Sequence, residues 1–146
     1  MPLELTPQEL TPEELAALKD KKILVVEDDP LLQNLLVGKM TQFRETGLKM
    51  LSAFNAEKAF ELARTEKPDL ILLDLILPGM SGFEFLTELR KDPASAEIPV
   101  IVLSNLNEDQ DKDKVKELGI IKYFVKANFS LETIAKEVAG LLMKRP

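Results

Sequence analysis

Short apolar runs alternate along this chain with longer segments in which apolar residues recur at helical spacing. The runs are rich in leucine and β-branched residues, and buried strands are expected at residues 23–26, 48–53, 69–74, 98–103 and 121–125. Helices are expected at about residues 30–43, 56–63, 82–91, 107–118 and 131–141. Because each connection between strands is long enough for a helix, the pattern predicts an α/β fold: a doubly wound parallel sheet of five strands with helices on both faces.

Polar residues suited to capping precede several of these helices. Asp29 before Pro30, Asn55 and Ser130 each stand where an N-cap is expected. The helix at 107–118 is unusually polar, and only Val115 and Leu118 offer it clear core contacts. The inward-facing residues of three other helices are expected to be Leu32, Leu35, Leu36, Met40 and Phe43; Phe83, Leu86 and Leu89; and Leu131, Ile134, Val138 and Leu141.

Residues 1–20 stand apart as an N-terminal extension to a domain at 21–143. Thr11 suits an N-cap, Pro12 the first helical position and Glu14 the residue that completes a capping box, so a short helix is expected at residues 12–19. Leu10 and Leu15 occupy the two positions of a hydrophobic staple. We expect a solvated leader that docks lightly on the domain; an oligomerisation or partner arm is the alternative.

The central apolar run ends in a carboxylate, Asp74, followed by the turn sequence Pro78-Gly79-Met80-Ser81-Gly82. A desolvated carboxylate costs free energy unless it is paired or binds a metal. Taken alone, Asp74 is best explained as a cap for the next turn. A single lysine at a strand end is likewise usually solvated, and a single serine usually caps a turn.

Three other strand ends carry polar groups as well. The first predicted strand ends in Glu27 and Asp28, the fourth in Ser104 and the fifth in Lys126. In doubly wound sheets, ligands bind outside the carboxyl ends of the strands, so all these side chains should project onto one rim. Their joint occurrence in a five-unit α/β chain favours a functional site.

The chemistry of this set points to a cation and a phosphoryl group. Three converging carboxylates repel one another unless a cation lies among them, and oxygen ligands with room for water suit Mg²⁺ better than Ca²⁺. The Lys126 ammonium and the Ser104 hydroxyl are suited to holding phosphoryl oxygens. Asp74 lies between the two half-sites and is a candidate nucleophile.

The amino-acid composition excludes some kinds of site and argues against nucleic-acid binding. The 146 residues contain no cysteine, which excludes disulfides and thiolate metal sites, and no histidine, which removes the commonest general base. The net charge of −6 argues against nucleic-acid binding. The absence of a bilayer-length apolar run and of a signal-peptide pattern argues against a membrane location and makes a cytoplasmic one the default expectation.

Four motifs, in order and at these spacings, resemble the receiver domain of two-component response regulators. They are Val25-Val26-Glu27-Asp28-Asp29, residues 72–82, Val102-Leu103-Ser104 and Tyr123-Phe124-Val125-Lys126, and the resemblance covers about residues 21–143. It implies a flavodoxin-like strand order of 2-1-3-4-5. It also implies a signalling module that catalyses only its own phosphorylation and dephosphorylation.

The resemblance also assigns roles to residues of this chain. Asp74 matches the phospho-accepting aspartate, Asp28 the direct Mg²⁺ ligand and Glu27 its acidic partner acting through water. The backbone carbonyl of Ile76 matches the third protein ligand of the metal.

Ser104 and Lys126 match the hydroxyl and lysine of the family's activation switch, and Tyr123 matches its rotameric aromatic. Phosphate is expected to come from a histidine kinase or phosphotransfer protein. The face made by the helix at 107–118, strand 121–125 and the last helix should then change its partners, with an unknown downstream protein or a second copy as occupant.

One departure from the family concerns the residue after the lysine. The family's usual Lys-Pro is here Lys126-Ala127. Because a cis bond before a non-proline residue costs about 2.5–4 kcal/mol, this bond is expected to be trans.

Two other functions are weighed against a phosphorylated receiver. A haloacid-dehalogenase-type phosphatase needs a second aspartate two residues after the nucleophile, where this chain has Ile76. A pseudo-receiver that binds partners without phosphate is disfavoured by the intact acid, hydroxyl and lysine set. The absence of a Gly-rich first turn excludes a nucleotide-binding Rossmann domain. Since no output domain follows residue 143 in this sequence, a stand-alone regulator is expected.

Overall fold

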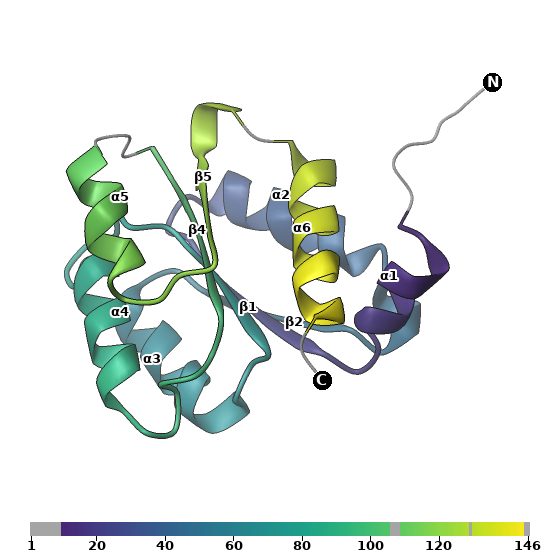
Figure 1. Ribbon diagram of the computed structural model, residues 1–146, viewed down its shortest axis with the longest axis horizontal. Helices are drawn as coiled ribbons and strands as arrows, with labels where there is room; N and C mark the ends of the chain where they lie inside the picture. Colours follow the sequence, from purple (N-terminus) through teal and green to yellow (C-terminus); the bar gives the residue numbers. More distant parts are fainter. Residues whose placement is uncertain (1–9, 106–108, 129, 145–146) are drawn as a thin grey trace.

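The computed structural model describes residues 10–105, 109–128 and 130–144, and a five-stranded parallel sheet lies at its centre (Figure 1). The strands are β1 (Lys22–Val26), β2 (Lys49–Ala53), β3 (Leu70–Leu73), β4 (Val100–Ser104) and β5 (Lys122–Val125). Their order is β2-β1-β3-β4-β5, and every neighbouring pair is parallel. This confirms the predicted fold class and strand order.

Helices cover both faces of the sheet. They are α1 (Pro12–Ala17), α2 (Pro30–Thr41), α3 (Ala56–Glu66), α4 (Gly82–Lys91), α5 (Asp109–Lys116) and α6 (Leu131–Met143), with short 3₁₀ turns η1 (Arg44–Thr46) and η2 (Lys126–Asn128). Figure 1 shows α3, α4 and α5 on one face and α1, α2 and α6 on the other. None of the helices within the described ranges is long and apolar enough to span a membrane.

The strands divide the hydrophobic core into two layers. Along β1, Leu24 and Val26 pack against the α3–α4–α5 side, whereas Ile23 and Val25 pack against the α2–α6 side. All four residues of β3 are buried, as expected for a central strand covered on both faces.

The predicted N-caps are present. Asp29 accepts a hydrogen bond from the backbone N–H of Leu31, Asn55 from that of Lys58 and Ser130 from that of Thr133. Pro30 is the first residue of α2. These caps fix where α2, α3 and α6 begin, a few residues after the carboxyl ends of β1, β2 and β5.

The inward position predicted for Leu35 was wrong, and some buried residues were missed, although Phe83 and Leu141 do pack against the core. In α2, Leu35 is 47% exposed, and the polar Gln33 is buried in the same helix. In α4, Phe85 is fully buried while Phe83 is only partly covered, and in α6 Leu142 is buried more deeply than Leu141. Clustered apolar residues fit more than one stripe, so periodicity alone did not choose the correct face.

The N-terminal helix packs more firmly than expected. Its capping box between Thr11 and Glu14 is present, but the helix ends at Ala17, and Leu10 and Leu18 on either side are buried in the core beside α6. Glu14 also accepts a hydrogen bond from the Lys136 ammonium of α6 at 2.9 Å. The prediction of light docking was therefore wrong.

Candidate functional site

The adjacent central strands β1 and β3 bring the predicted acids together. Val26 pairs with Leu73 in the register of the two strands, so Glu27 and Asp74 follow at the same carboxyl edge. The ladder continues one step further, because the backbone N–H of Asp74 donates to the carbonyl of Val26 at 3.0 Å.

Glu27, Asp28 and Asp74 form a compact carboxylate cluster. One oxygen from each lies within 4.8 Å of the others. The side chains of Glu27 and Asp74 are only 2% and 4% exposed, whereas Asp28 faces solvent. Two of the three acids are therefore desolvated, which requires compensating charge nearby.

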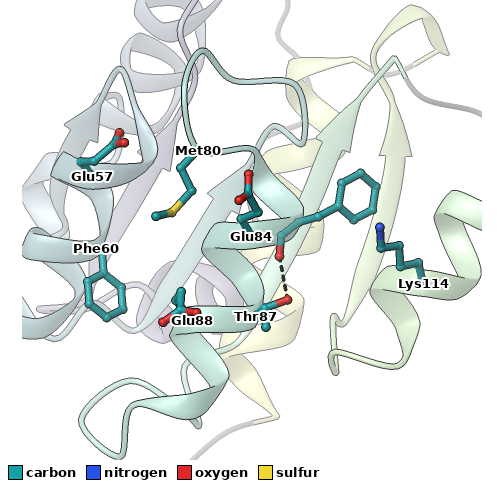
Figure 2. A pocket seen from close by; sticks show the side chains of 8 residues that line it. Glu57, Phe60, Met80, Glu84, Thr87, Glu88 and Lys114 are labelled. Atoms are coloured by element: carbon teal, nitrogen blue, oxygen red, sulfur yellow. Dashed lines mark hydrogen bonds between the residues drawn. The ribbon is translucent and has the colours of Figure 1, made fainter.

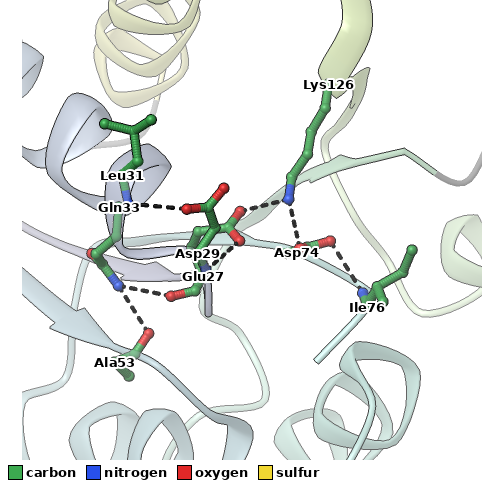
Figure 3. A network of polar contacts seen from close by, with 8 residues as sticks. All are labelled: Glu27, Asp29, Leu31, Gln33, Ala53, Asp74, Ile76 and Lys126. Atoms are coloured by element: carbon green, nitrogen blue, oxygen red, sulfur yellow. Dashed lines mark hydrogen bonds and ion pairs between the residues drawn. The ribbon is translucent and has the colours of Figure 1, made fainter. Parts of the chain in front are cut away.

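Lys126 supplies part of that compensation. It begins the turn η2 just after β5, and its ammonium lies 2.8 Å from Glu27 Oε1 and 2.7 Å from Asp74 Oδ2 (Figure 3). Burial alone would lower the pKa of Lys126, but hydrogen bonds to Asp74 and Glu27 raise it above its ordinary value. Burial raises the pKa of Glu27 in spite of this contact.

Backbone donors fix the second oxygen of both buried carboxylates. Glu27 Oε2 accepts a hydrogen bond from the N–H of Asp29 at 3.1 Å, and Asp74 Oδ1 accepts one from the N–H of Ile76 at 3.1 Å. Each carboxylate is thus held between the lysine and the chain. Both oxygens of each buried carboxylate therefore have a partner.

Gln33 supports this site and was missed from the sequence. Its side-chain amide donates to the carbonyl of Glu27 at 3.1 Å and to that of Ala53 at 3.0 Å, joining the ends of β1 and β2 to α2 (Figure 3). Its Oε1 is buried and has no hydrogen-bond partner among the described residues. A glutamine three residues before Leu36 and seven before Met40 shares their helix face, and this was the available signal.

The loop after Asp74 needs a glycine at position 82. A Cβ there would lie 2.6 Å from the Asp74 carbonyl oxygen and 2.5 Å from Leu75 Cα, both in the main chain. The N–H of Gly82 also donates to the carbonyl of Leu75 at 2.9 Å. This close approach holds the start of α4 against the segment that carries Asp74.

The two remaining predicted residues lie on β4 and β5. Ser104 is fully buried at the end of β4, at the same carboxyl edge as the acids. Tyr123 is half-buried on β5 opposite Val102, and the Lys112 ammonium of α5 lies 5.7 Å from its ring centroid. Lys126–Ala127 is trans, as predicted, since no peptide bond between described residues is cis. The predicted start of the helix at Asn107 lies outside the described residues.

The donor set fits a hard divalent cation. If the three carboxylates and the Lys126 ammonium are all ionised, the cluster keeps a net charge of −2. All its side-chain ligands are oxygens, which favour Mg²⁺ or a similar ion, and the exposed Asp28 leaves a side open to water. This group could therefore hold a metal.

The sequence profile of the family described as "Response regulator receiver domain" matches residues 23–139. Protein PilH from Pseudomonas aeruginosa is 33% identical over 83% of this chain and 97% of its own length. The phosphate regulon transcriptional regulatory protein PhoB from the same organism is 32% identical over 86% of this chain, which spans only 54% of PhoB. Several other curated relatives are likewise matched over about half their length.

Solved structures agree with these sequence matches. The receiver domain of the Francisella response regulator 1452 superposes with a TM-score of 0.71 at 30% identity, covering 86% of this chain and 98% of that one. The Vibrio cholerae chemotaxis protein CheY4 shares the fold, with a TM-score of 0.72 at 24% identity over 81% of this chain.

Proposed function

The chain belongs to the response regulator receiver domain family, and from that premise we propose that Asp74 is phosphorylated and controls partner binding. Receivers are signalling modules rather than classical enzymes. The proposed receiver unit is 21–143, with 1–20 as its N-terminal extension. One observation carries the proposal: Asp74 is buried at the rim of the central strand, paired with Lys126 and grouped with Glu27 and Asp28.

We propose that the phosphoryl donor is a phosphohistidine of a kinase or phosphotransfer protein. A carboxylate oxygen of Asp74 forms a bond to phosphorus while the bond from phosphorus to the histidine nitrogen breaks, and the electron pair stays on the imidazole. The Ile76 N–H and the Lys126 ammonium orient the Asp74 carboxylate for this attack. After transfer, Lys126 is close enough to pair with a phosphoryl oxygen.

Mg²⁺ is the proposed cofactor. Asp28, Asp74 and the Ile76 carbonyl would hold it directly, with Glu27 acting through water. When bound, the ion neutralises charge on the phosphoryl oxygens. The geometry of the three carboxylates supports this assignment, because their oxygens already converge.

Ser104 and Tyr123 are the proposed switch residues. Ser104 lies at the same strand edge as Asp74, which supports a role for its hydroxyl in engaging a new phosphoryl group. Tyr123 shares β5 with the residues that lead into Lys126. Reorientation of the two side chains would alter the face made by α5, β5 and α6, where a downstream protein or a second copy would bind.

The test is incubation with Mg²⁺ and a small phosphodonor such as acetyl phosphate, followed by intact mass measurement. Wild type should gain one phosphoryl group, Asp74→Asn none, and Asp28→Ala far less than wild type. Asp29→Asn is the matched control, because asparagine keeps the N-cap of α2 while removing an adjacent acid outside the cluster. Labelling of Asp74→Asn at the wild-type level would refute the assignment.

A further inference from the structure

A groove opens between α3 and α4 and reaches Lys114 of α5 at one end. It encloses about 540 Å³, a size typical of ligand sites. Its walls come from α3, α4, α5 and the loop after β3 (Figure 2). We define the α3–α4 groove by an apolar floor and an acidic rim: Phe60, Met80 and Phe83, with Glu57, Glu84 and Glu88.

The floor of the groove offers adaptable apolar surface. Phe60, Met80 and Phe83 are each partly buried, so they are held in place but keep a face toward the hollow. Figure 2 shows Met80 reaching between α3 and α4. A flexible thioether in the same lining as two aromatic side chains can adjust to differently shaped apolar groups.

The acidic rim is incompletely neutralised. Within the described chain, no basic side chain forms an ion pair with Glu57 or Glu84. Glu88 has only a 3.7 Å contact with the exposed Lys91 on its own helix. Glu84 Oε1 accepts a hydrogen bond from the backbone N–H of Ser81 at 3.0 Å, so Glu57 and Glu88 carry the least compensated charge of the rim. The groove therefore combines apolar contact with negative charge, which is complementary to a cation that has an apolar neighbour.

One lysine already demonstrates such an interaction. The Lys114 ammonium of α5 lies 4.5 Å from the ring centroid of Phe83 and closes the end of the groove nearest α5. The quadrupole of an aromatic ring attracts a cation placed over its face, and the attraction is strongest where water is excluded from the contact. Phe60 presents the same kind of surface, and the Arg64 guanidinium already lies 5.8 Å from its ring centroid.

The shape favours a peptide segment over a compact small molecule. A second hollow of about 510 Å³ adjoins the first along α3 and shares Glu57 and Phe60 with it. The second hollow is lined by Glu61 and Arg64 as well, so a further acid and one basic side chain lie beside it. Neighbouring hollows along a helix suit the amphipathic segments of helix-in-groove recognition.

We propose that the α3–α4 groove binds a basic amphipathic segment of a partner protein, with an apolar anchor against Met80 and arginine or lysine beside the glutamates. This site shares no residue with the proposed phosphorylation site, but Lys114 at its end belongs to α5, one element of the face that phosphorylation is proposed to control. It would allow the receiver to hold one partner while its other face responds to Asp74.

The experiment measures binding of a short labelled synthetic peptide, with leucine and phenylalanine on one helical face and arginine on the other, by fluorescence anisotropy. Glu57→Gln with Glu88→Gln should raise Kd about three- to tenfold, in keeping with partly exposed ion pairs. Met80→Ser should weaken binding at least as much. Lys114→Met should tighten it by freeing Phe83, whereas Lys116→Met, on the same helix outside the groove, should not.

The matched charge control is Glu13→Gln with Glu45→Gln, which removes the same charge from exposed positions elsewhere. Amide NMR shifts on peptide addition should map to α3, α4 and the loop through Met80. The proposal is overturned if the control pair weakens binding equally, if a peptide with glutamate in place of arginine binds as well, or if the shifts lie elsewhere. Self-association of the protein that Met80→Ser abolishes would instead identify a second copy as the occupant and also overturn it.

Discussion

Helices α5 and α6 flank the edge strand β5 on opposite faces of the sheet, and they are anchored very differently. Among the described side chains of α5, only Val115 is fully buried. In α6, Ile134, Ala135, Val138, Ala139 and Leu142 are all buried. Since tertiary burial supplies most helix stability in proteins, α5 should be the easier of the two to displace.

This difference bears on how the molecule can respond to a signal. A ligand or modification shifts a conformational equilibrium only by its differential free energy for the two states, so a weakly anchored element can be moved at small cost. Lys112 of α5 also lies over the Tyr123 ring, which connects the loose helix to a proposed switch residue. α6 can serve as the fixed reference against which α5 moves.

The largest expected effect is on the anchored side. Ile134→Ala should lower the free energy of unfolding by about 2–5 kcal/mol, because it removes a fully buried side chain and leaves a cavity. Urea denaturation measures this. Ile134→Val, the conservative control, should cost about 0.5–1.5 kcal/mol. If Val115→Ala in α5 cost as much as Ile134→Ala, the two helices would be equally anchored.

Hydrogen exchange tests the same contrast without mutation. Backbone amides of α5 should exchange at least about tenfold faster than those of α6, since local opening of α5 exposes little apolar area. The interior amides of both helices are compared, because frayed ends exchange quickly in any helix. Equal protection in α5 and α6 would contradict the comparison.

Arg90 limits how far α5 can loosen. Its guanidinium donates to the carbonyls of Leu118 at 2.7 Å and Gly119 at 3.3 Å, just beyond α5, and to those of Ala96 and Ile98 before β4. Burial lowers the pKa of Arg90, with Glu97 opposing that shift, but an arginine stays charged at any ordinary pH. This clamp fixes the segment just beyond the end of α5.

Arg90→Met should therefore destabilise the protein by about 1–3 kcal/mol and raise amide exchange at the end of α5 more than in α6. Lys91→Met is the control, because the neighbouring Lys91 makes only a surface contact with Glu88. Arg90→Lys should rescue stability poorly, as an ammonium cannot reproduce the planar fork. A uniform loss of protection across both helices would mean that Arg90 stabilises the whole fold rather than α5.

The features that were predictable from sequence are those that local patterns determine, whereas those that depend on tertiary packing were not. The strands and the carboxylate cluster follow from local signals: apolar runs, caps such as Asp29, and acids at the ends of β1 and β3. The strand order was predicted from the family resemblance. The role of Gln33 and the exposure of Leu35 depend on how α2 is rotated against its neighbours, which several leucines in a row leave undetermined. Arg90 was not predicted, because its partners are backbone carbonyls that only the folded chain brings together.

The packing of α1 could not be predicted from the sequence either. This packing holds α6 in place in addition to its contacts with the core. Leu10 and Leu18 join the core beside α6, and Glu14 bridges to Lys136. The hydrogen bond from Lys136, followed by that from the Thr11 backbone, holds the pKa of Glu14 below its ordinary value. A carboxyl whose folded pKa is lowered stabilises the fold above its unfolded pKa, and that contribution is lost as pH falls through the folded pKa.

The smallest expected effect is therefore on the pH dependence of this α1–α6 bridge. Glu14→Gln should lower Tm by about 1–3 °C at neutral pH, because partly exposed ion pairs contribute little. The difference from wild type should shrink as pH falls below about 4.5, the ordinary value for this carboxyl. Glu13→Gln, one residue away in α1 and exposed, is the control. Raised salt should reduce the effect, because it screens the Lys136 charge while glutamine can keep the hydrogen bond from the Thr11 N–H. If Glu14→Gln and Glu13→Gln gave the same Tm at every pH, α1 would hold α6 through its leucines alone, and the asymmetry between α5 and α6 would rest entirely on apolar burial.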